Sequence, residues 1–406
     1  MMSLQPESPV GKRRNIGVLL TMPRFGGGSY QWTVNILHVL ADYAALTSSN
    51  IHIFTFSGYG ERMEIETDFP QFKFHQISNA DRCLMAVLRK AASALPALIP
   101  AIRRVFSLNS ILLREGVDLV IFPTTMLDSA LCKIRHIFFL ADIGHIFHPE
   151  FFTKDECRRR NVLFRHGLQA AGTVVVETNQ LKEDIIKHYG VNAGKIRVLH
   201  QTLSKSLESL SAPGMDDEQI RFRKELPAKY IFYPAQLWSH KNHSNLLRAV
   251  GMVKREVPDL QLILCGARKA GDDTVFGLIK DLGLEDSVRC LGYVPDRLMP
   301  VLYRNARALV LPTYLGPTNI PTLEAFFYGC PAIISDLPGV REQTGDAALF
   351  FDPDSPEEIA ERISLVLRDE SIREGMINKG YERSKLLSYE NYRRTLLGII
   401  GKAEFA

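Results

Sequence analysis

The residues best suited to chemistry lie where a loop enters a helix near residue 320. The run from Leu311 to Pro331 leaves a strand pattern, crosses a Gly/Pro loop and starts a helix with Pro321 near its first position, where proline is favoured. The amides from Thr318 to Thr322 lack intrahelical acceptors and would form an anion site. Glu324 lies one turn further and has the reach to accept hydrogen bonds from a ribose diol. The alternative for Glu324 is a carboxylate that only complements the helix dipole.

A second candidate follows the first strand pattern of the second half, Tyr230 to Pro234. Lys241 comes shortly after it, where a lysine can place a point charge on a diphosphate. Taken alone, such a lysine is more often a solvated surface residue. The neighbouring His240 and His243 could suggest a metal pair, but no carboxylate or cysteine nearby completes a ligand set, and we predict no metal site.

Glycines follow the first strand pattern of the chain, Asn15 to Met22. Gly26, Gly27 and Gly28 stand before a helix pattern that begins at about Gln31. Glycines at a strand-to-helix turn let the backbone approach a ligand, and the helix amides beyond them attract an anion. The alternative is a flexible turn. The run is neither GxGxxG nor GxxxxGK[ST], which argues against an ordinary dinucleotide fold or P-loop.

Elements that could position these residues alternate along the chain. Short β-branched runs and helix-length segments predict two tandem doubly wound α/β domains with parallel sheets. We place an N-terminal domain at 1–205, a polar linker at 206–228, a C-terminal domain at 229–388 and a helix at 389–406 that packs back toward the first domain. Ligands of such sheets bind beyond the carboxyl ends of the strands, so a cleft between the domains is the expected site.

Composition excludes several classes of protein. The chain has 406 residues, 46% hydrophobic and 23% charged, and 49 Lys plus Arg against 45 Asp plus Glu, a formal charge of +4. That excess is too small to predict a nucleic-acid partner. The six cysteines form no CxxC pair, which argues against a zinc ribbon or a thioredoxin-type motif. The start resembles no signal peptide and no apolar stretch reaches the ~20 residues of a spanning helix, so we expect a cytoplasmic protein.

One segment of the first half is both basic and apolar. Residues 82–114 contain no acid but carry six basic residues among many large aliphatic ones. This composition is typical of an interfacial membrane contact, which would make the protein peripheral on the inner membrane and its acceptor lipid-linked. A pair of core helices, broken at Pro96 and Pro100 and with cations on the solvated face, explains the segment equally well.

Taken together, these motifs resemble the retaining glycosyltransferases of family 4, which have the two-domain GT-B fold. The resemblance covers nearly the whole chain. It is most specific in the second domain, and it rests there on the following runs: Tyr233-Pro234, His240-Lys241-Asn242, Leu291-Gly292-Tyr293-Val294-Pro295, the Glu324 loop and Ser335-Asp336-Leu337-Pro338-Gly339.

The resemblance implies a role for each candidate residue. Lys241 and the amides of Thr318, Asn319 and Ile320 would hold the donor's diphosphate. Glu324 would bind the ribose, backbone near Tyr293 and Val294 would frame the base, and Gly27 and Gly28 would approach the diphosphate. The run Leu140 to Glu150 matches the family's first-domain loop, in which His145 would face the sugar with Asp142 beside it.

Two positions depart from the family's pattern. Gly316 stands where the first of two glutamates is usual, and Gln236 stands where an arginine ahead of the lysine is common and counts here among the donor-binding candidates. The loop around Gly316 nevertheless looks like a variant of some bacterial members assigned to mannose or related sugars. The departures therefore indicate a subgroup trait or a weakened site.

The resemblance implies a retaining, metal-independent hexosyltransferase with mannose favoured. It would use a GDP- or UDP-linked donor and no other cofactor in bacterial polysaccharide or lipopolysaccharide synthesis. The acceptor would be a saccharide or a lipid-linked saccharide. The alternatives are a catalytically weakened nucleotide-sugar-binding subunit and a sugar-nucleotide epimerase, although the Lys241 and Glu324 motifs argue against the epimerase. The oligomeric state is not specified.

Overall fold

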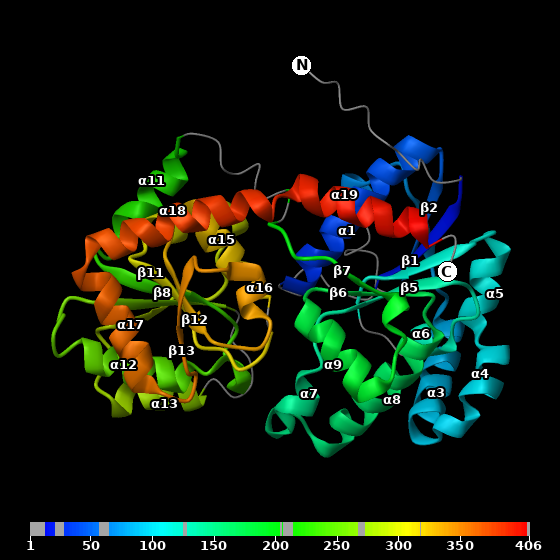
Figure 1. Cartoon of the computed structure of the whole chain (residues 1–406), viewed down its shortest axis with the longest axis horizontal. Helices are drawn as coiled ribbons and strands as arrows, with labels where there is room; N and C mark the ends of the chain where they lie inside the picture. The colour runs from blue at the N-terminus through cyan, green and yellow to red at the C-terminus, as the bar shows by residue number, and fades with distance from the viewer. Residues whose placement is uncertain are drawn as a thin grey trace. The chain divides into compact units, whose positions relative to one another are not determined.

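The computed structural model describes residues 13–20, 28–56, 65–124, 128–203, 205, 214–266, 273–316 and 318–403. The chain divides into two compact units. The N-terminal unit holds Met1–His200 together with Glu390–Ala406, and the C-terminal unit holds Gln201–Tyr389. Each unit is built on a single parallel sheet covered by helices (Figure 1), which confirms the predicted α/β class.

The sheet of the N-terminal unit has seven parallel strands in the order β3-β2-β1-β4-β5-β6-β7. Parallel strands between two helix layers are buried on both faces, which explains continuous apolar runs such as that of β5. The strands are β1 (Asn15–Leu20), β2 (Asn50–Thr55), β3 (Lys73–Gln76), β4 (Leu119–Phe122), β5 (His136–Leu140), β6 (Thr173–Val176) and β7 (Ile196–Val198).

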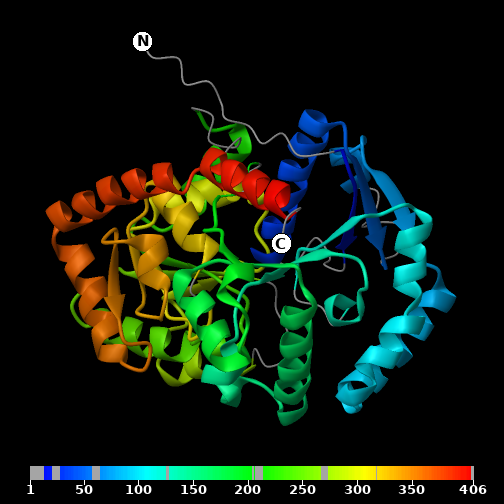
Figure 2. The same ribbon diagram turned by 45° about the vertical axis from the view of Figure 1, so that its right-hand side comes forward.

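Helices cover both faces of this sheet. On one face lie α1 (Gly28–Thr47) and the last helix, α19 (Tyr389–Lys402), where Arg393 Nε donates to Asp42 Oδ2 at 2.5 Å. The other face, seen from a second direction in Figure 2, carries the remaining helices. These are α3 (Asn79–Ala94), α4 (Ile99–Val105), α5 (Ser107–Arg114), α6 (Asp128–Leu131), α7 (Gly144–Phe147), α8 (Lys154–Ala170) and α9 (Asn179–Tyr189).

The C-terminal unit has a six-stranded parallel sheet in the order β10-β9-β8-β11-β12-β13. Its strands are β8 (Tyr230–Pro234), β9 (Gln261–Cys265), β10 (Val288–Cys290), β11 (Ala308–Leu311), β12 (Ala332–Ser335) and β13 (Ala348–Phe351). On one face α12 (His243–Val253) packs against α17 (Pro356–Arg368), with α13 (Asp273–Asp281) beside α12. On the other face, α15 (Ile320–Tyr328) packs against both α14 (Met299–Asn305) and α18 (Glu370–Leu386).

The remaining elements are short. The α-helices are α11 (Asp217–Glu225) and α16 (Val340–Thr344). The 3₁₀ helices are η1 (Pro96–Leu98), η2 (Pro149–Phe151), η3 (Ala193–Lys195), η4 (Ser239–Lys241) and η5 (Asp296–Leu298).

Part of the expected linker is helical. Residues 206–213 lie outside the described residues, but α11 begins within the predicted linker at a capping box formed by Asp216 and Gln219. Gln219 Nε2 donates to the Arg297 carbonyl at 2.7 Å, and Arg297 pairs with Glu218 at 2.6 Å. These contacts tie the segment to the C-terminal unit. The capping box explains why part of this polar segment is helical.

By length and composition, the described chain contains one segment apolar enough to cross a membrane, Pro96–Arg114. The structure divides this segment into η1, α4 and α5, with extended backbone at Phe106 between the last two. Ile99, Ile102 and Leu108 are buried against the N-terminal core. Core helices pass the same composition test, so the segment is weak evidence for a span.

Candidate functional site

The predicted donor residues of the C-terminal unit lie beyond the carboxyl ends of its strands, a region that we call the donor edge. The chain winds from β8 outward through β9 to β10, then returns to the other side of β8 with β11. The carboxyl ends of β8 and β11 therefore form a topological switch point, where open α/β sheets bind ligands. The loops that carry Lys241 and Asn319 leave the sheet at these two ends.

The loop after β8 is held by buried hydrogen bonds. Asn242 has a positive φ of 56°, and its side-chain amide donates to the carbonyls of Pro312 (3.0 Å) and Pro353 (2.7 Å). The Tyr233 hydroxyl donates to the Lys241 carbonyl at 2.8 Å. The backbone of Lys241 is thus fixed on both sides, and its side chain is half-buried.

The same loop is joined directly to the loop after β11. The Tyr314 amide donates to the His240 carbonyl at 2.9 Å, and the buried Thr313 hydroxyl donates to that carbonyl at 3.2 Å. These bonds place the Lys241 loop beside the segment that leads into α15. Two of the predicted donor elements, joined through residues 73 positions apart in sequence, therefore form one surface.

Gly316 has a backbone conformation that explains the absence of a glutamate there. Its φ is +91°, a value that residues with a side chain rarely adopt. Asn319 Nδ2 donates to the Gly316 carbonyl at 2.6 Å and closes the loop. The Asn319 side chain therefore spans the loop and makes no cap hydrogen bond to α15.

The start of α15 presents backbone amides at the sheet edge. Thr322 donates to the Asn319 carbonyl at 2.9 Å, so the predicted anion site is narrower than Thr318 to Thr322. Thr318, Asn319 and Ile320 precede or begin the helix, where amides have no intrahelical acceptor. Their positive dipole end can hold an anion near Lys241.

Glu324 is a buried carboxylate with a defined partner. It is 6% exposed on α15, and its Oε2 accepts a hydrogen bond of 2.5 Å from the hydroxyl of Tyr303 on α14. Burial, followed by the nearby Glu324 charge, raises the pKa of Tyr303 well above its usual value, so Tyr303 acts as a neutral donor. The burial of Glu324 does not exclude the helix-dipole alternative, so its ribose role stays a prediction.

Loops after β9 and β10 complete the edge. Gly266 follows β9 with its amide bonded to the Gly292 carbonyl at 2.9 Å. A Cβ on Gly266 would lie 2.5 Å from the Ala235 carbonyl oxygen, so only glycine fits this approach. Tyr293 is 59% exposed directly after Gly292, while Val294 is buried. Both lie beyond the carboxyl end of β10, where a base could bind.

Gln236 lies on the same edge, two residues beyond β8. Its side-chain oxygen accepts a hydrogen bond of 2.6 Å from the indole nitrogen of Trp238. The side chain is therefore engaged within its own loop, and its predicted contact with the donor stays a prediction.

In the N-terminal unit, Asp142 and His145 follow the carboxyl end of β5. Asp142 Oδ1 accepts a hydrogen bond of 2.8 Å from the Gly144 amide and helps start α7. His145 is 2% exposed, and its Nε2 lies 3.3 Å from both Asn161 Oδ1 and the Tyr189 hydroxyl. Burial is the main cause that lowers its pKa.

This placement makes His145 a packed residue of the N-terminal core. Its ring contacts Phe164 edge-on with centroids 5.0 Å apart, and its Nδ1 has no hydrogen-bond partner among the described residues. A catalytic role for His145 therefore stays a prediction that requires the imidazole to leave this packing. Nearby, His148 Nδ1 lies 3.0 Å from Glu150 Oε1.

The glycine loop is only partly described. Gly26 and Gly27 lie outside the described residues, and Gly28 is the first residue of α1. The predicted approach of Gly27 and Gly28 to a diphosphate stays a prediction.

One group of potential metal ligands occurs among the described residues, away from the carboxyl edges. His52 of β2 and His75 of β3 lie near Glu115, which follows α5. His52 Nδ1 and His75 Nε2 are 3.0 Å apart, the distance of a hydrogen bond that shares one proton.

In the C-terminal unit, His243 is buried against Tyr233, and burial lowers its pKa to about 3.

Sequence reasoning missed two positioning residues, Tyr303 and Asn242. The partner of Tyr303 depends on how α14 packs against α15, which no local pattern shows. Asn242 had a usable signal, because asparagine is the residue most tolerant of positive φ after glycine and it stands directly before a helix. Together with Lys241 and Glu324 they build an edge that can bind a diphosphate beside a group rich in hydroxyls.

Comparisons with known proteins match this architecture. Residues 216–383, within the C-terminal unit, match the family described as Glycosyl transferases group 1. The chain is 29% identical over 255 residues to O-antigen chain mannosyltransferase B of Escherichia coli, covering 62% of this chain and 66% of that protein. It is 26% identical over 215 residues to O-antigen chain mannosyltransferase RfbU of Salmonella typhimurium, covering 52% and 55%.

The matched region thus spans between half and two thirds of the length of these relatives. The Anabaena HepE structure in complex with UDP and glucose superposes with a TM-score of 0.72 at 16% identity, covering 96% of this chain and 100% of that one. At this identity the likeness shows the fold, and the fold is GT-B. The resemblance to bacterial group 1 mannosyltransferases is confirmed.

Proposed function

We propose that the protein is a retaining hexosyltransferase, because its fold is GT-B and residues 216–383 match the family described as Glycosyl transferases group 1. It moves a hexose, with mannose favoured, from a GDP- or UDP-linked donor to a saccharide or lipid-linked saccharide in bacterial polysaccharide synthesis. The observation that carries the proposal is the pair of hydrogen-bonded loops that sets Lys241 beside the start of α15, with Glu324 one turn further along that helix.

The donor's leaving group is the part that this edge suits best. As the bond from sugar to diphosphate breaks, negative charge grows on the diphosphate oxygens. Lys241 and the amides of Thr318, Asn319 and Ile320 are held in place before the reaction, so they stabilise that charge without reorganising. We propose that these groups do so without a metal ion, and that the buried Glu324 carboxylate binds the ribose hydroxyls.

Relatives support the choice of sugar and pathway. Two matched proteins are O-antigen chain mannosyltransferases. The nucleotide is supported less sharply, because the GT-B neighbour from Anabaena holds UDP and glucose. We propose GDP-mannose as the first donor to test and UDP-hexoses as the second.

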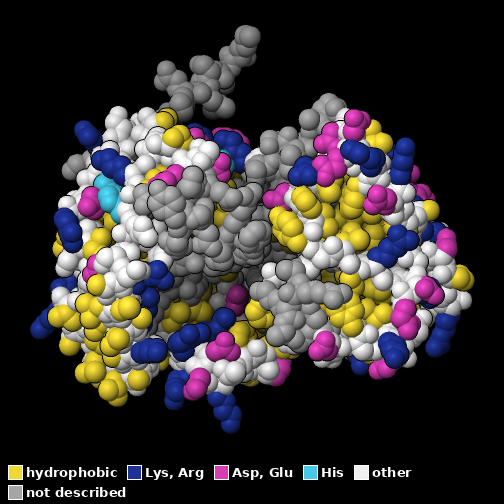
Figure 3. All heavy atoms as spheres, turned by 180° about the vertical axis from the view of Figure 1, so that it is seen from behind, with side chains coloured by type: hydrophobic (Ala, Val, Ile, Leu, Met, Phe, Trp, Pro, Cys, Tyr) yellow, Lys and Arg dark blue, Asp and Glu magenta, His cyan; other side chains and the backbone are white. Residues whose placement is uncertain are grey.

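The acceptor side is assigned to the N-terminal unit. Asp142 stands at the carboxyl end of β5, where a hydroxyl of the acceptor or the donor sugar could be oriented. We propose that the protein works in the cytoplasm, peripheral on the inner membrane through residues 82–114. Figure 3 shows hydrophobic side chains gathered at the lower left of the N-terminal unit. The large exposed hydrophobic residues of the segment are Leu84, Val87, Leu95, Leu98, Val105 and Leu113.

The transfer is tested with purified protein, GDP-mannose or a UDP-hexose, and lipid extracts that contain undecaprenyl-linked saccharides. We expect one donor class to give a labelled product whose new linkage keeps the donor's anomeric configuration by NMR. Glu324→Ala should abolish labelling, whereas Glu285→Ala, an exposed glutamate of the same unit, should not. An inverted linkage, or full activity in Glu324→Ala, would contradict the proposal.

A nucleotide-sugar-binding subunit without activity is the second candidate, because Gln236 and Gly316 replace charged residues that are usual in the family 4 glycosyltransferases that this chain resembles. The φ of Gly316 favours a differently built loop over a damaged one. Donor binding that is lost in Glu324→Ala, with no turnover on any acceptor, would favour the subunit.

A further inference from the structure

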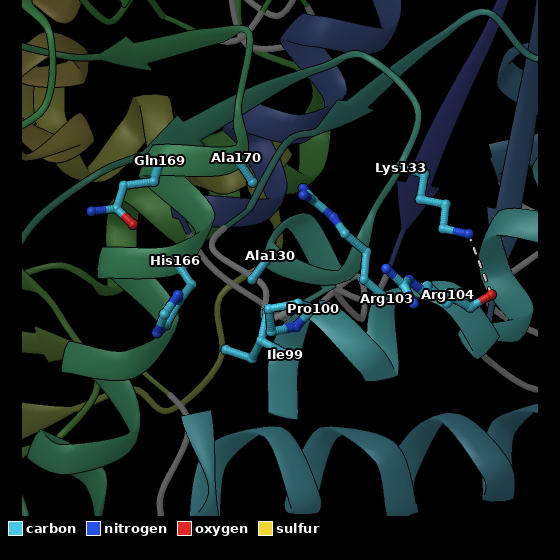
Figure 4. Close-up of a pocket in the computed structure, with 9 residues that line it drawn as sticks. All are labelled: Ile99, Pro100, Arg103, Arg104, Ala130, Lys133, His166, Gln169 and Ala170. Carbon is cyan, nitrogen blue, oxygen red and sulfur yellow. Dashed lines mark hydrogen bonds between the residues drawn. The ribbon is translucent and has the colours of Figure 1, made fainter. Parts of the chain in front are cut away.

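A pocket of about 440 Å³ opens on the N-terminal unit. It lies between α4, the α6–β5 connection and the end of α8, and Figure 4 shows the side chains around it. The lining residues are Ile99, Pro100, Arg103, Arg104, Ala130, Lys133, His166, Gln169 and Ala170. Lys133 precedes β5 and Ala170 precedes β6, so the pocket lies at the amino ends of these strands.

The pocket is therefore separate from Asp142. Asp142 follows β5 at its carboxyl end, and the five residues of β5 span roughly 15 Å. A ligand in the pocket would not occupy the edge that the transfer reaction uses.

The charge of the pocket is strongly one-sided. Arg103, Arg104 and Lys133 line it, and no Asp or Glu does. No ion pair joins any of the three to a carboxylate within the described ranges of the chain. The nearby buried Asp128 is already neutralised, because Arg89 binds its Oδ1 at 2.8 Å.

Two of the three cations donate to neutral backbone groups, which fix their positions without cancelling their charge, and Arg104 adds an exposed charge. Arg103 Nε donates to the Cys132 carbonyl at 2.9 Å, and Lys133 Nζ donates to the Arg104 carbonyl at 3.3 Å. The buried Asn109 side chain donates to the carbonyls of Arg103 and Leu131, both at 3.0 Å, and accepts from the Lys133 amide at 2.8 Å. One asparagine thus fastens α4, α6 and the start of the β5 connection together.

Apolar groups surround these charges. Ile99, Pro100 and Ala130 line the pocket itself. On the same segment Leu95, Leu98 and Val105 are 59%, 42% and 65% exposed. A preformed set of cations beside exposed aliphatic side chains matches a ligand with a phosphate group and acyl chains, since the phosphate meets the arginines while the chains meet the aliphatic rim.

We propose that this pocket binds the phosphate headgroup of an anionic membrane lipid. The inference does not depend on the transfer reaction, because no residue of the pocket belongs to the donor edge. It rests on the proposed membrane contact of residues 82–114, which supply four of the nine lining residues, and it adds a specific lipid site to that contact.

The test uses the full chain and vesicles of phosphatidylcholine with or without phosphatidylglycerol, analysed by flotation. Arg104→Gln with Lys133→Gln removes two exposed pocket charges. Arg159→Gln with Lys187→Gln is the matched control, because it removes two exposed charges of the same unit that lie outside residues 82–114 and outside the pocket. We expect the pocket variant to weaken binding to phosphatidylglycerol vesicles roughly thirtyfold and the control less than about fivefold.

Amide hydrogen exchange on the vesicles should show protection of residues 99–105 and 130–133 in the wild type and loss of that protection in the pocket variant. Equal losses of vesicle binding in the two variants would overturn the pocket while leaving a diffuse membrane contact. Unchanged binding in the pocket variant would overturn the pocket as well. Protection of the same residues by inorganic phosphate, without vesicle binding, would overturn the lipid as ligand. Circular dichroism and thermal melting check that both variants fold.

Discussion

Replacing Tyr303 by Phe tests how Glu324 is held. The substitution keeps the ring, which packs edge-on against Phe232 with centroids 5.1 Å apart, and removes only the hydroxyl that donates to Glu324 at 2.5 Å. Both side chains are buried, so no bulk water replaces the lost donor. A hydrogen bond to a charged group contributes about 1.5–3 kcal/mol, and we expect a loss of stability near 2 kcal/mol in the C-terminal unit.

That loss should lower the melting temperature of this unit by about 4–8 °C. Donor affinity should also fall, by up to about tenfold, because the Glu324 carboxylate loses its fixed orientation. The assays are thermal melting followed by intrinsic fluorescence, and titration of the nucleotide sugar by calorimetry. Activity should show a raised KM for the donor with a smaller change in kcat, since Tyr303 positions Glu324 and does not itself meet the reacting atoms.

Tyr230→Phe is the matched control. Tyr230 is equally buried, and its hydroxyl donates to the neutral Leu302 carbonyl at 2.7 Å at the amino end of β8, away from the donor edge. The Tyr230→Phe substitution should lower the free energy of unfolding by about 1 kcal/mol and leave donor affinity unchanged. The reasoning fails if Tyr303→Phe changes neither stability nor donor affinity. It also fails if Tyr230→Phe weakens donor binding as much as Tyr303→Phe does.

Three further predictions concern single residues. Lys241→Gln should weaken donor binding about 10–100-fold in calorimetry, while Lys280→Gln on α13 should not; equal affinities would contradict the phosphate role. Gly316→Glu should weaken donor binding about 5–30-fold, because φ +91° costs a side chain about 1–2 kcal/mol, and improved turnover would contradict this. Burial lowers the pKa of His243 to about 3, below its unfolded value, so the unfolded chain binds the proton first. The free energy of unfolding of the C-terminal unit should therefore be highest above about pH 6.5 and lower by about 2 kcal/mol at pH 5, as measured by urea titration. His243→Phe should remove this decrease.

The donor edge could be predicted largely from local patterns. Pro321 near the helix start and Gly329 at its end bound α15 in the sequence, and Gly329 has the expected left-handed φ of 72°. The alternation of strands and helices likewise predicts parallel doubly wound sheets, which bind ligands beyond the carboxyl ends of their strands. Lys241 and Asn319 stand at the ends of two such strands, so their approach follows from topology.

Features that depend on packing could not be predicted. His145 is buried because α7 turns its ring toward Asn161 and Tyr189, which lie 16 and 44 residues further along the chain. The pocket beside Arg103 could not be predicted for the same reason, since Lys133 and α8 join α4 only in the folded unit. The φ of Gly316 is set by a bond from Asn319, three residues away, and a glycine in a loop has too many accessible conformations for its identity alone to fix one.

The central claim is that the joined loops of the C-terminal unit bind a nucleotide sugar. The most direct measurement is thermal stabilisation of the purified protein by GDP-, UDP-, ADP- and dTDP-sugars, repeated on Glu324→Ala. A ligand that binds only the folded state raises its stability in proportion to ln(1 + [L]/Kd). A rise of the melting temperature with one nucleotide class, lost in Glu324→Ala, is the predicted result. An equal rise in Glu324→Ala, or no rise with any donor, would contradict the account.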